Sequence, residues 1–316
     1  MQGAKLVVDV TYRCNARCRY CKWSVGDTSV SFNRSPVDLC VNPSILQAAN
    51  ISRVVLSGGE PLLYSDIDVV IRHYRSAQIP DIVIITNGLI ASLSRLKACV
   101  SYGATGFAFS IDSSPNDTII QCARAMTHKQ HEQVFRNLSN ARSLVELYGI
   151  ELTVNCVLSA SNCSLESIKQ LMYDCAERGV TSIKFQPVFN DGFMEVNAPE
   201  LRLGSEHASI IRSIGRDSSR WPIVTNPLHF FEEVAKMCEG QTLDSRSCGL
   251  NGTTYLLQEG GLVICPWISS TPAKTVNDIS RLSRDFCKSI RSCSSGPQCF
   301  CLQPRNHSWG FSDGDT

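Results

Sequence analysis

The chain contains the stretch Leu6-Val-Val-Asp-Val10-Thr-Tyr-Arg-Cys14-Asn-Ala-Arg-Cys18-Arg-Tyr-Cys21, in which an apolar run leads directly into three cysteines. The apolar, β-branched run predicts a buried strand, and the cysteines follow it in a C-x3-C-x2-C loop. Thiolates at this spacing can close on one soft metal centre. In a cube of four irons, three cysteines leave one iron open to a substrate or cofactor, as in a catalytic zinc site. Three ordinary reduced cysteines, or a zinc site, are the alternatives.

A second motif, Ser57-Gly58-Gly59-Glu60-Pro61, follows the apolar residues 54–56. Its glycines allow backbone to approach a ligand closely, and a carboxylate at this place can receive an ammonium group. Taken alone, Gly-Gly-Glu-Pro is an ordinary strand-to-loop turn. At this distance after the three cysteines, however, it makes the chain resemble the radical S-adenosylmethionine (SAM) enzymes.

The resemblance implies a set of ligands for two cofactors. In that family three cysteines hold a [4Fe-4S] cluster, SAM chelates the fourth iron, and the Gly-Gly-Glu segment holds the methionine amino group. The cluster ligands here are then Cys14, Cys18 and Cys21, and Tyr20 lies near the adenine. The resemblance assigns SAM to the segment Gly58, Gly59, Glu60 and Pro61. Further matches follow later apolar runs, and they are Asn87, Ser110, Asp112, Asn155 and Gln186.

Composition fits an enzyme with one large core and a smaller domain, since 43% of the 316 residues are hydrophobic and 19% are charged. The net charge of +1 gives no sign of nucleic-acid or membrane partners. The N-terminus leads straight into a strand, so we expect no signal peptide. The sixteen cysteines gather at two sites, which favours metal ligation in a reducing cytoplasm over disulfides.

Strand-like and helix-like segments alternate over the first two-thirds of the chain, which predicts an α/β fold with parallel strands. We expect strands at residues 6–10, 54–56, 82–85, 106–111, 151–158 and 183–188, and helices that include 67–76, 130–147 and 164–178. Six such units suit the open, partial (β/α)6 barrel of the resembled family. Nearly all the proposed ligand residues lie at or just past a predicted strand end, as barrel enzymes require. Asn155 is the exception, because it lies mid-run.

The chain changes character near residue 217. Residues 216–222 resemble a linker and 228–236 a short helix, after which turn residues and cysteines dominate. We therefore expect a barrel core at residues 1–216, a linker and bridging helix at 217–247, and a small cysteine-rich domain at 248–316.

Residues 248–265 predict a β-hairpin that turns at Glu259-Gly260-Gly261 and brings Cys248 close to Cys265. The spacing resembles the start of the SPASM and twitch domains, which carry auxiliary [4Fe-4S] clusters. The later cysteines depart from the full SPASM pattern, so the shorter twitch arrangement with one cluster fits better. The ligands we favour are Cys248, Cys265, Cys293 and Cys299, with Cys287 and Cys301 as alternatives. A structural zinc site is the other interpretation.

The resemblance implies that the cluster passes an electron into SAM, and that the resulting 5′-deoxyadenosyl radical abstracts hydrogen from an unactivated C–H bond. An electron donor such as flavodoxin or ferredoxin would supply that electron. Cys14 comes too early for an N-terminal peptide-recognition domain, which favours a small natural product: a sugar, aminocyclitol, aminoglycoside or nucleoside. Dehydrogenation or epimerisation is then expected, with Cys238 as one possible hydrogen-atom donor. A peptide maturase or epimerase is the second hypothesis, and a non-catalytic zinc- or cluster-binding module is the third.

Overall fold

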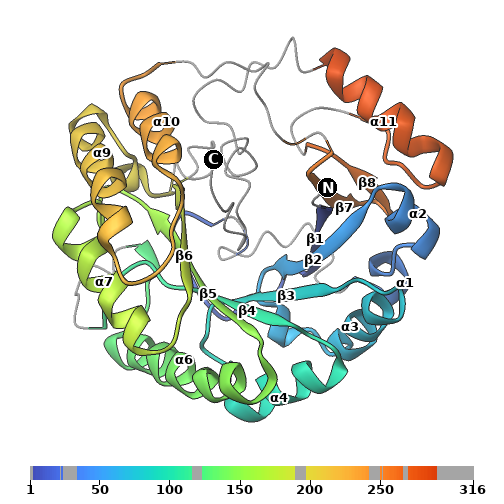
Figure 1. Cartoon of the computed structure of the whole chain (residues 1–316), viewed down its shortest axis with the longest axis horizontal. Helices are drawn as coiled ribbons and strands as arrows, with labels where there is room; N and C mark the ends of the chain where they lie inside the picture. The colour runs from blue at the N-terminus through green and yellow to red at the C-terminus, as the bar shows by residue number, and fades with distance from the viewer. Residues whose placement is uncertain are drawn as a thin grey trace.

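A computed structural model of the chain describes residues 3–21, 23, 34–115, 123–188, 197–241, 250, 252–265 and 270–289. Within these residues the strands form one sheet in the order β6-β5-β4-β3-β2-β1-β7-β8 (Figure 1). Neighbouring strands are parallel throughout, except that β8 runs antiparallel to β7. The strands are β1 Ala4–Thr11, β2 Ile51–Gly58, β3 Asp81–Thr86, β4 Gly106–Ser110, β5 Glu151–Leu158, β6 Ser182–Pro187, β7 Thr254–Gln258 and β8 Gly261–Val263.

Helices form an arc around the outside of this curved sheet (Figure 1). The helices of the described residues are α1 Pro36–Leu39, α2 Pro43–Ala48, α3 Ile67–Ser76, α4 Leu93–Tyr102, α6 His128–Tyr148, α7 Leu165–Glu177, α9 Ala208–Asp217, α10 Leu228–Cys238 and α11 Val276–Ser289. Short 3₁₀ turns occur at η2 Pro61–Leu63, η3 Pro199–Leu201, η4 Ser205–His207 and η5 Ser218–Arg220. The predicted α/β fold with a partial parallel barrel is confirmed. None of the described helices is both long enough and apolar enough to cross a lipid bilayer.

The two faces of the barrel strands differ in polarity: the outer face packs against the helices, and the inner face lines the barrel. On β1, Leu6, Val8 and Val10 are fully buried in the core between sheet and helices. Lys5, just before Leu6, and Asp9, between Val8 and Val10, face the inside of the barrel because successive side chains alternate. The outer face therefore holds the sheet to its helices, and the inner face carries most of the polar side chains.

All six predicted barrel strands are present, and so are the three predicted helices of the barrel. The interpretation of residues 216–222 as a linker is wrong at its start, because α9 continues to Asp217. That helix buries Ile211 and Ile214, a helical spacing that the sequence analysis passed over. The expectation of turn-rich chain after residue 236 also fails at α11, where Leu282 and Phe286, four residues apart, are buried.

The predicted hairpin is confirmed as β7 and β8. Its turn residues Glu259 and Gly260 both adopt positive φ, 47° and 71°, as a two-residue type I′ turn requires. β7 also pairs in parallel with β1, so that Leu6 lies opposite Tyr255. The hairpin thus extends the barrel sheet beyond β1.

Candidate functional site

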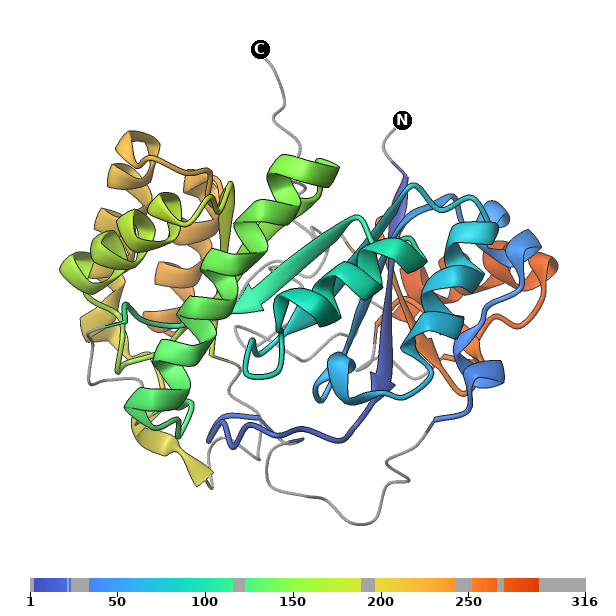
Figure 2. The ribbon, with the colours of Figure 1, turned by 90° about the horizontal axis from the view of Figure 1, so that it is seen from below.

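The three cysteines of the C-x3-C-x2-C motif follow β1 at the edge of the sheet where the parallel strands end. In Figure 2 this dark blue segment runs beneath that edge, from the end of β1 toward the side of α6 and α9. The backbone N–H of Arg19 donates to the carbonyl of Ala123, at 2.9 Å, and its guanidinium pairs with Glu200. The Tyr20 side chain packs against a small apolar cluster that includes Leu201. The cysteine loop therefore spans the mouth of the barrel.

Gly58 and Gly59 allow the cysteine loop to lie directly against the end of β2. The N–H of Gly59 donates to the Thr11 carbonyl at 2.7 Å, and the N–H of Glu60 donates to the Arg13 carbonyl at 2.8 Å. A Cβ on Gly58 would lie 2.3 Å from the Thr11 carbonyl oxygen, and one on Gly59 would lie 2.2 Å from that of Arg13. Gly58 also has a φ of 115°, which side chains disfavour. The double glycine is thus required by backbone contact with the loop.

Glu60 is buried, and its carboxylate links the turn that follows β2 to the end of β3. The side chain is fully buried and accepts hydrogen bonds from the Leu62 N–H at 3.1 Å, the Thr86 hydroxyl at 2.8 Å and the Asn87 N–H at 2.7 Å. Burial raises the pKa of Glu60 to about 7, although these three hydrogen bonds and Arg95 oppose the shift. The carboxylate that we expected to receive an ammonium group therefore already binds three donors of the chain itself.

Asn87 connects the hydrogen bonds of Glu60 to the cysteine loop. Its Nδ2 lies 2.8 Å from Oδ1 of Asn15 and 3.7 Å from Sγ of Cys14, while its Oδ1 accepts from the Leu89 N–H at 3.0 Å. Glu60 fixes the backbone of Asn87, so it indirectly positions an amide donor beside the first cysteine. Contacts of this kind, one step removed from the metal, set ligand orientation in metal sites.

Replacing Glu60 by Ala is expected to weaken SAM binding by about tenfold or more. The change leaves three buried donors without an acceptor, at roughly 1–3 kcal/mol each, and it releases Asn87 from its position beside Cys14. Anaerobic equilibrium binding of SAM to the reconstituted protein measures the effect. Glu146→Ala is the matched control, because that glutamate is 65% exposed in a surface pair with Arg142. An unchanged dissociation constant in Glu60→Ala would show that this segment does not shape the SAM site.

Asp112 forms a buried ion pair with Arg124, a residue that the sequence analysis did not select. Their side chains are only 4% and 5% exposed, and Nε of Arg124 lies 2.7 Å from Oδ2 of Asp112. Asp112 also accepts from the Tyr20 hydroxyl and from the Val157 N–H, both at 2.8 Å. Arg124 in turn points Nη1 toward Sγ of Cys18, at 3.9 Å. This network ties the cysteine loop to the ends of β4 and β5.

Arg124→Met is expected to lower the free energy of unfolding by roughly 3–5 kcal/mol, because it leaves the Asp112 carboxylate buried without its cation. Chemical denaturation measures this loss. Arg142→Met is the matched control: that arginine pairs with Glu146 on the surface and should cost less than about 1 kcal/mol. If the two variants lose equal stability, the network does not hold the loop.

Ser110, Asn155 and Gln186 lie on three neighbouring strands at the same end of the barrel. Ser110 is in register with Asn155, and Gln186 is in register with Val157 two residues further along β5. Asn155 lies within β5, as expected, and its Oδ1 is buried with no hydrogen-bond partner in the described residues. The structure thus brings these three predicted contacts together on the inner face. Asp112, in contrast, uses both carboxylate oxygens within the protein.

The donor set of the cysteine loop fits the implied iron–sulfur cluster. Burial raises the pKa of the Cys18 thiol to about 12, although Arg124 opposes this, and burial also raises the pKa of Cys14. Metal binding displaces such thiol protons. Among the described residues, no three Cys, His, Asp or Glu side chains converge closely enough to bind one metal ion. A cube differs from a single ion in binding each thiolate through a separate iron.

The second group of cysteines falls largely outside the described residues. Cys248, Cys293, Cys299 and Cys301 all lie there, so their predicted ligation is not tested. Cys265 follows β8 and is buried, whereas Cys287 is exposed on α11. Cys238 ends α10, in the outer helix layer, and interacts electrostatically with Cys163. This position gives no support to Cys238 as a hydrogen-atom donor.

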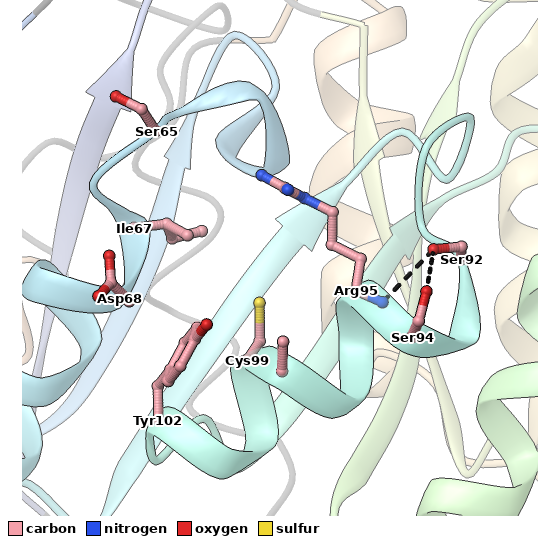
Figure 3. A pocket seen from close by; sticks show the side chains of 9 residues that line it. Ser65, Ile67, Asp68, Ser92, Ser94, Arg95, Cys99 and Tyr102 are labelled. Carbon is pink, nitrogen blue, oxygen red and sulfur yellow. Dashed lines mark hydrogen bonds between the residues drawn. The ribbon is translucent and has the colours of Figure 1, made fainter.

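A groove of about 370 Å³ lies on the outer layer between α3 and α4, away from the inner face of the sheet (Figure 3). Asp68, Arg95, Cys99 and Tyr102 are among the residues that line it. The Arg95 guanidinium leaves the groove to donate to the carbonyl of Leu62, in the turn that follows Glu60. Through Arg95 the groove adjoins the turn that follows Glu60, and none of the residues that line it belongs to the cysteine loop.

Comparison with known proteins gives a consistent result. Residues 8–155 match the family model of the Radical SAM superfamily. The GTP 3′,8-cyclase of Aliarcobacter butzleri is 26% identical over 239 residues, which cover 72% of this chain and 68% of that protein. The mitochondrial GTP 3′,8-cyclase of Arabidopsis thaliana is 29% identical over 168 residues, and the match covers 48% of this chain but only 38% of that protein.

Two solved structures share the fold. Streptococcus suis SuiB bound to S-adenosylmethionine superposes with a TM-score of 0.66 at 14% identity, covering 96% of this chain and 72% of SuiB. The protein anSMEcpe, bound to AdoMet and a peptide, gives a TM-score of 0.63 at 15% identity, covering 95% of this chain and 87% of anSMEcpe. At such identities the likeness concerns the fold alone.

Proposed function

Because residues 8–155 form a domain of the radical SAM superfamily, we propose that this chain cleaves SAM reductively and acts on a small molecule at an unactivated C–H bond. When bound, a [4Fe-4S] cluster and SAM supply a 5′-deoxyadenosyl radical that abstracts hydrogen. The observation that supports this most strongly is the close contact of Gly58 and Gly59 with the three-cysteine loop, which leaves no room for a side chain at either glycine.

The chain's own residues would hold and orient these groups. Cys14, Cys18 and Cys21 are the cluster ligands, and Asn87 orients the first of them. Glu60 fixes Asn87, and Tyr20 joins the loop to Asp112. Ser110, Asn155 and Gln186 offer polar contacts from the inner wall. In this proposal the cluster ligands lie at the mouth of the barrel and the polar side chains lie just inside it, an arrangement that would keep the reacting atoms positioned and shielded from water.

The substrate class we propose is a sugar, aminocyclitol, aminoglycoside or nucleoside, and the outcome is dehydrogenation or epimerisation. The two relatives described above support a small substrate, because they are named for a reaction of GTP. We also propose one auxiliary [4Fe-4S] cluster on Cys248, Cys265, Cys293 and Cys299. Such a cluster would accept the electron released when the substrate is oxidised.

A peptide substrate is the second candidate, since SuiB, which shares this fold, was solved with its precursor peptide SuiA. A panel assay separates the two classes. Reduced, reconstituted protein is incubated with SAM and deuterated members of each small-molecule class, or with deuterated peptides. We expect deuterium in 5′-deoxyadenosine only with a small molecule. Deuterium transfer only from peptides would overturn the proposed substrate class, and no SAM cleavage at all would overturn the proposed function.

A further inference from the structure

Lys184 lies beside Asn155 on the inner wall of the barrel, and neither the sequence motifs nor the proposed function has given Lys184 a role. Lys184 of β6 is in register with Asn155 of β5, which in turn is in register with Ser110 of β4. Their chain neighbours Cys156 and Phe185 belong to the apolar core on the outer face. Since successive strand residues alternate in direction, Lys184 and Asn155 both face inward.

Both side chains end in a buried polar atom that has no partner. Lys184 is only 7% exposed, and within the part of the chain that the structure describes neither its Nζ nor Oδ1 of Asn155 makes a hydrogen bond. Burying an ammonium without a hydrogen bond or counter-charge is costly. Native proteins rarely leave such groups unsatisfied, and a bound ligand is one of the explanations when they do.

The nearby acidic side chain pairs with an arginine rather than with Lys184. Glu151, on β5, attracts Lys184 electrostatically, but its carboxylate is bonded to Arg53 at 2.9 Å. Nε of Arg53 also lies 3.6 Å from Oδ2 of Asp81. Arg53 therefore pairs with both carboxylates. No ion pair of the described residues includes Lys184. Burial lowers the pKa of Lys184 to about 8, which leaves the ammonium mostly protonated at neutral pH.

We propose that Lys184 and Asn155 bind one anionic group of a ligand, a carboxylate or a phosphate, together with a hydroxyl or amine beside it. The ammonium of Lys184 neutralises the anion, and Oδ1 of Asn155 accepts from the neighbouring donor. The inference deepens the proposed function, on which it rests, by adding one anionic group to the substrate class. In the order of the sheet, four strands separate β6 from β1, the strand that the cysteine loop follows. This separation favours the substrate as the source. The carboxylate of SAM is the second source, and the experiment must separate the two.

A change in stability gives the first test. Lys184→Met removes an uncompensated buried charge, so the ligand-free variant is expected to melt higher than the wild type. Lys169→Met is the matched control, because that lysine is exposed on α7 and should leave the melting temperature unchanged. If Lys184 only stabilised the fold, its replacement by Met would lower the melting temperature. A lower melting temperature for Lys184→Met would overturn the proposal.

Binding gives the second test, with inorganic phosphate, SAM and 5′-methylthioadenosine, which lacks the carboxylate, as probes. Phosphate, compared with chloride at equal ionic strength, is expected to raise the wild-type melting temperature by about 2 °C or more. Lys184→Met and Asn155→Asp should lose this rise, while Lys184→Arg and Lys169→Met keep it. With an unchanged dissociation constant for SAM, that result assigns the anion to the substrate.

If Lys184→Met instead raises the dissociation constant of SAM by about tenfold and leaves that of 5′-methylthioadenosine unchanged, the anion is the SAM carboxylate. If neither the phosphate effect nor SAM binding changes, the proposal is wrong. These readouts do not depend on SAM cleavage by the wild type. Failure of the anion site is therefore distinguishable from failure of the proposed function.

Discussion

Replacing Cys14, Cys18 and Cys21 together by Ala is expected to remove about four irons per chain, the content of one cube, and to abolish SAM cleavage. The loop would keep its fold, because Gly59 and Glu60 hold it through its backbone at Thr11 and Arg13 rather than through its thiols. Iron analysis with Mössbauer spectroscopy of the anaerobically reconstituted protein, and chromatography of 5′-deoxyadenosine, measure the two losses.

The iron that remains in this triple variant tests the second group of cysteines. If the auxiliary cluster exists, about eight irons fall to about four, whereas about four fall to none if it does not. Cys99→Ala is the control, because Cys99 is a buried thiol on α4 in the outer layer, and it should keep all the iron. Continued formation of 5′-deoxyadenosine by the triple variant would contradict the assignment of the cluster ligands.

Gly59→Ala is expected to have nearly as large an effect, although it removes no ligand. The added Cβ would lie 2.2 Å from the carbonyl oxygen of Arg13 and 2.6 Å from its carbon, so backbone must move. Such overpacking costs roughly 1–3 kcal/mol. It also shifts the cysteine loop, and a misplacement of about 1 Å near a reacting centre can cost about a hundredfold in rate. We expect SAM cleavage to fall by about that factor.

Gly149→Ala provides the control for this substitution. Gly149 caps α6 with a φ of 63°, and a Cβ added there would have no atom within 4 Å. The change should cost about 1–2 kcal/mol through backbone strain alone, with SAM cleavage per folded molecule preserved. Equal loss of cleavage in both variants would mean that general destabilisation, rather than the loop contact, explains the effect of Gly59→Ala.

The sequence was informative wherever local pattern decides structure. Apolar, β-branched runs predicted β1 to β6, and Glu259-Gly260-Gly261 predicted the hairpin turn. The motifs Cys14–Cys21 and Gly58–Pro61 predicted that two strand ends lie at one site, because parallel strands end at a common edge. The structure adds the reason for the double glycine, namely the backbone contact with the cysteine loop.

What the sequence did not reveal depends on contacts between distant residues. Arg124 lies in a stretch with no periodic pattern, and its contact with Cys18 crosses 106 positions. Glu60 looked like a ligand for a cofactor amine, but Thr86 and Asn87, 26 and 27 residues away, occupy its carboxylate. Nothing in the predicted strand at residues 183–188 singles out Lys184, and only its register with Asn155 shows which polar side chain it lies beside. The helical pattern of α11 was obscured by the surrounding cysteines and turn residues.

The central claim is that the cysteine loop holds a cluster with one iron open to SAM. Electron paramagnetic resonance of the reduced, reconstituted wild type, recorded with and without SAM, tests it most directly. We predict that SAM changes the spectrum of one cluster, and that isotopic labelling of the SAM amino nitrogen with ¹⁵N alters its hyperfine coupling. The change should vanish in the Cys14/Cys18/Cys21→Ala variant. A fully loaded cluster whose spectrum is the same with and without saturating SAM would contradict the account.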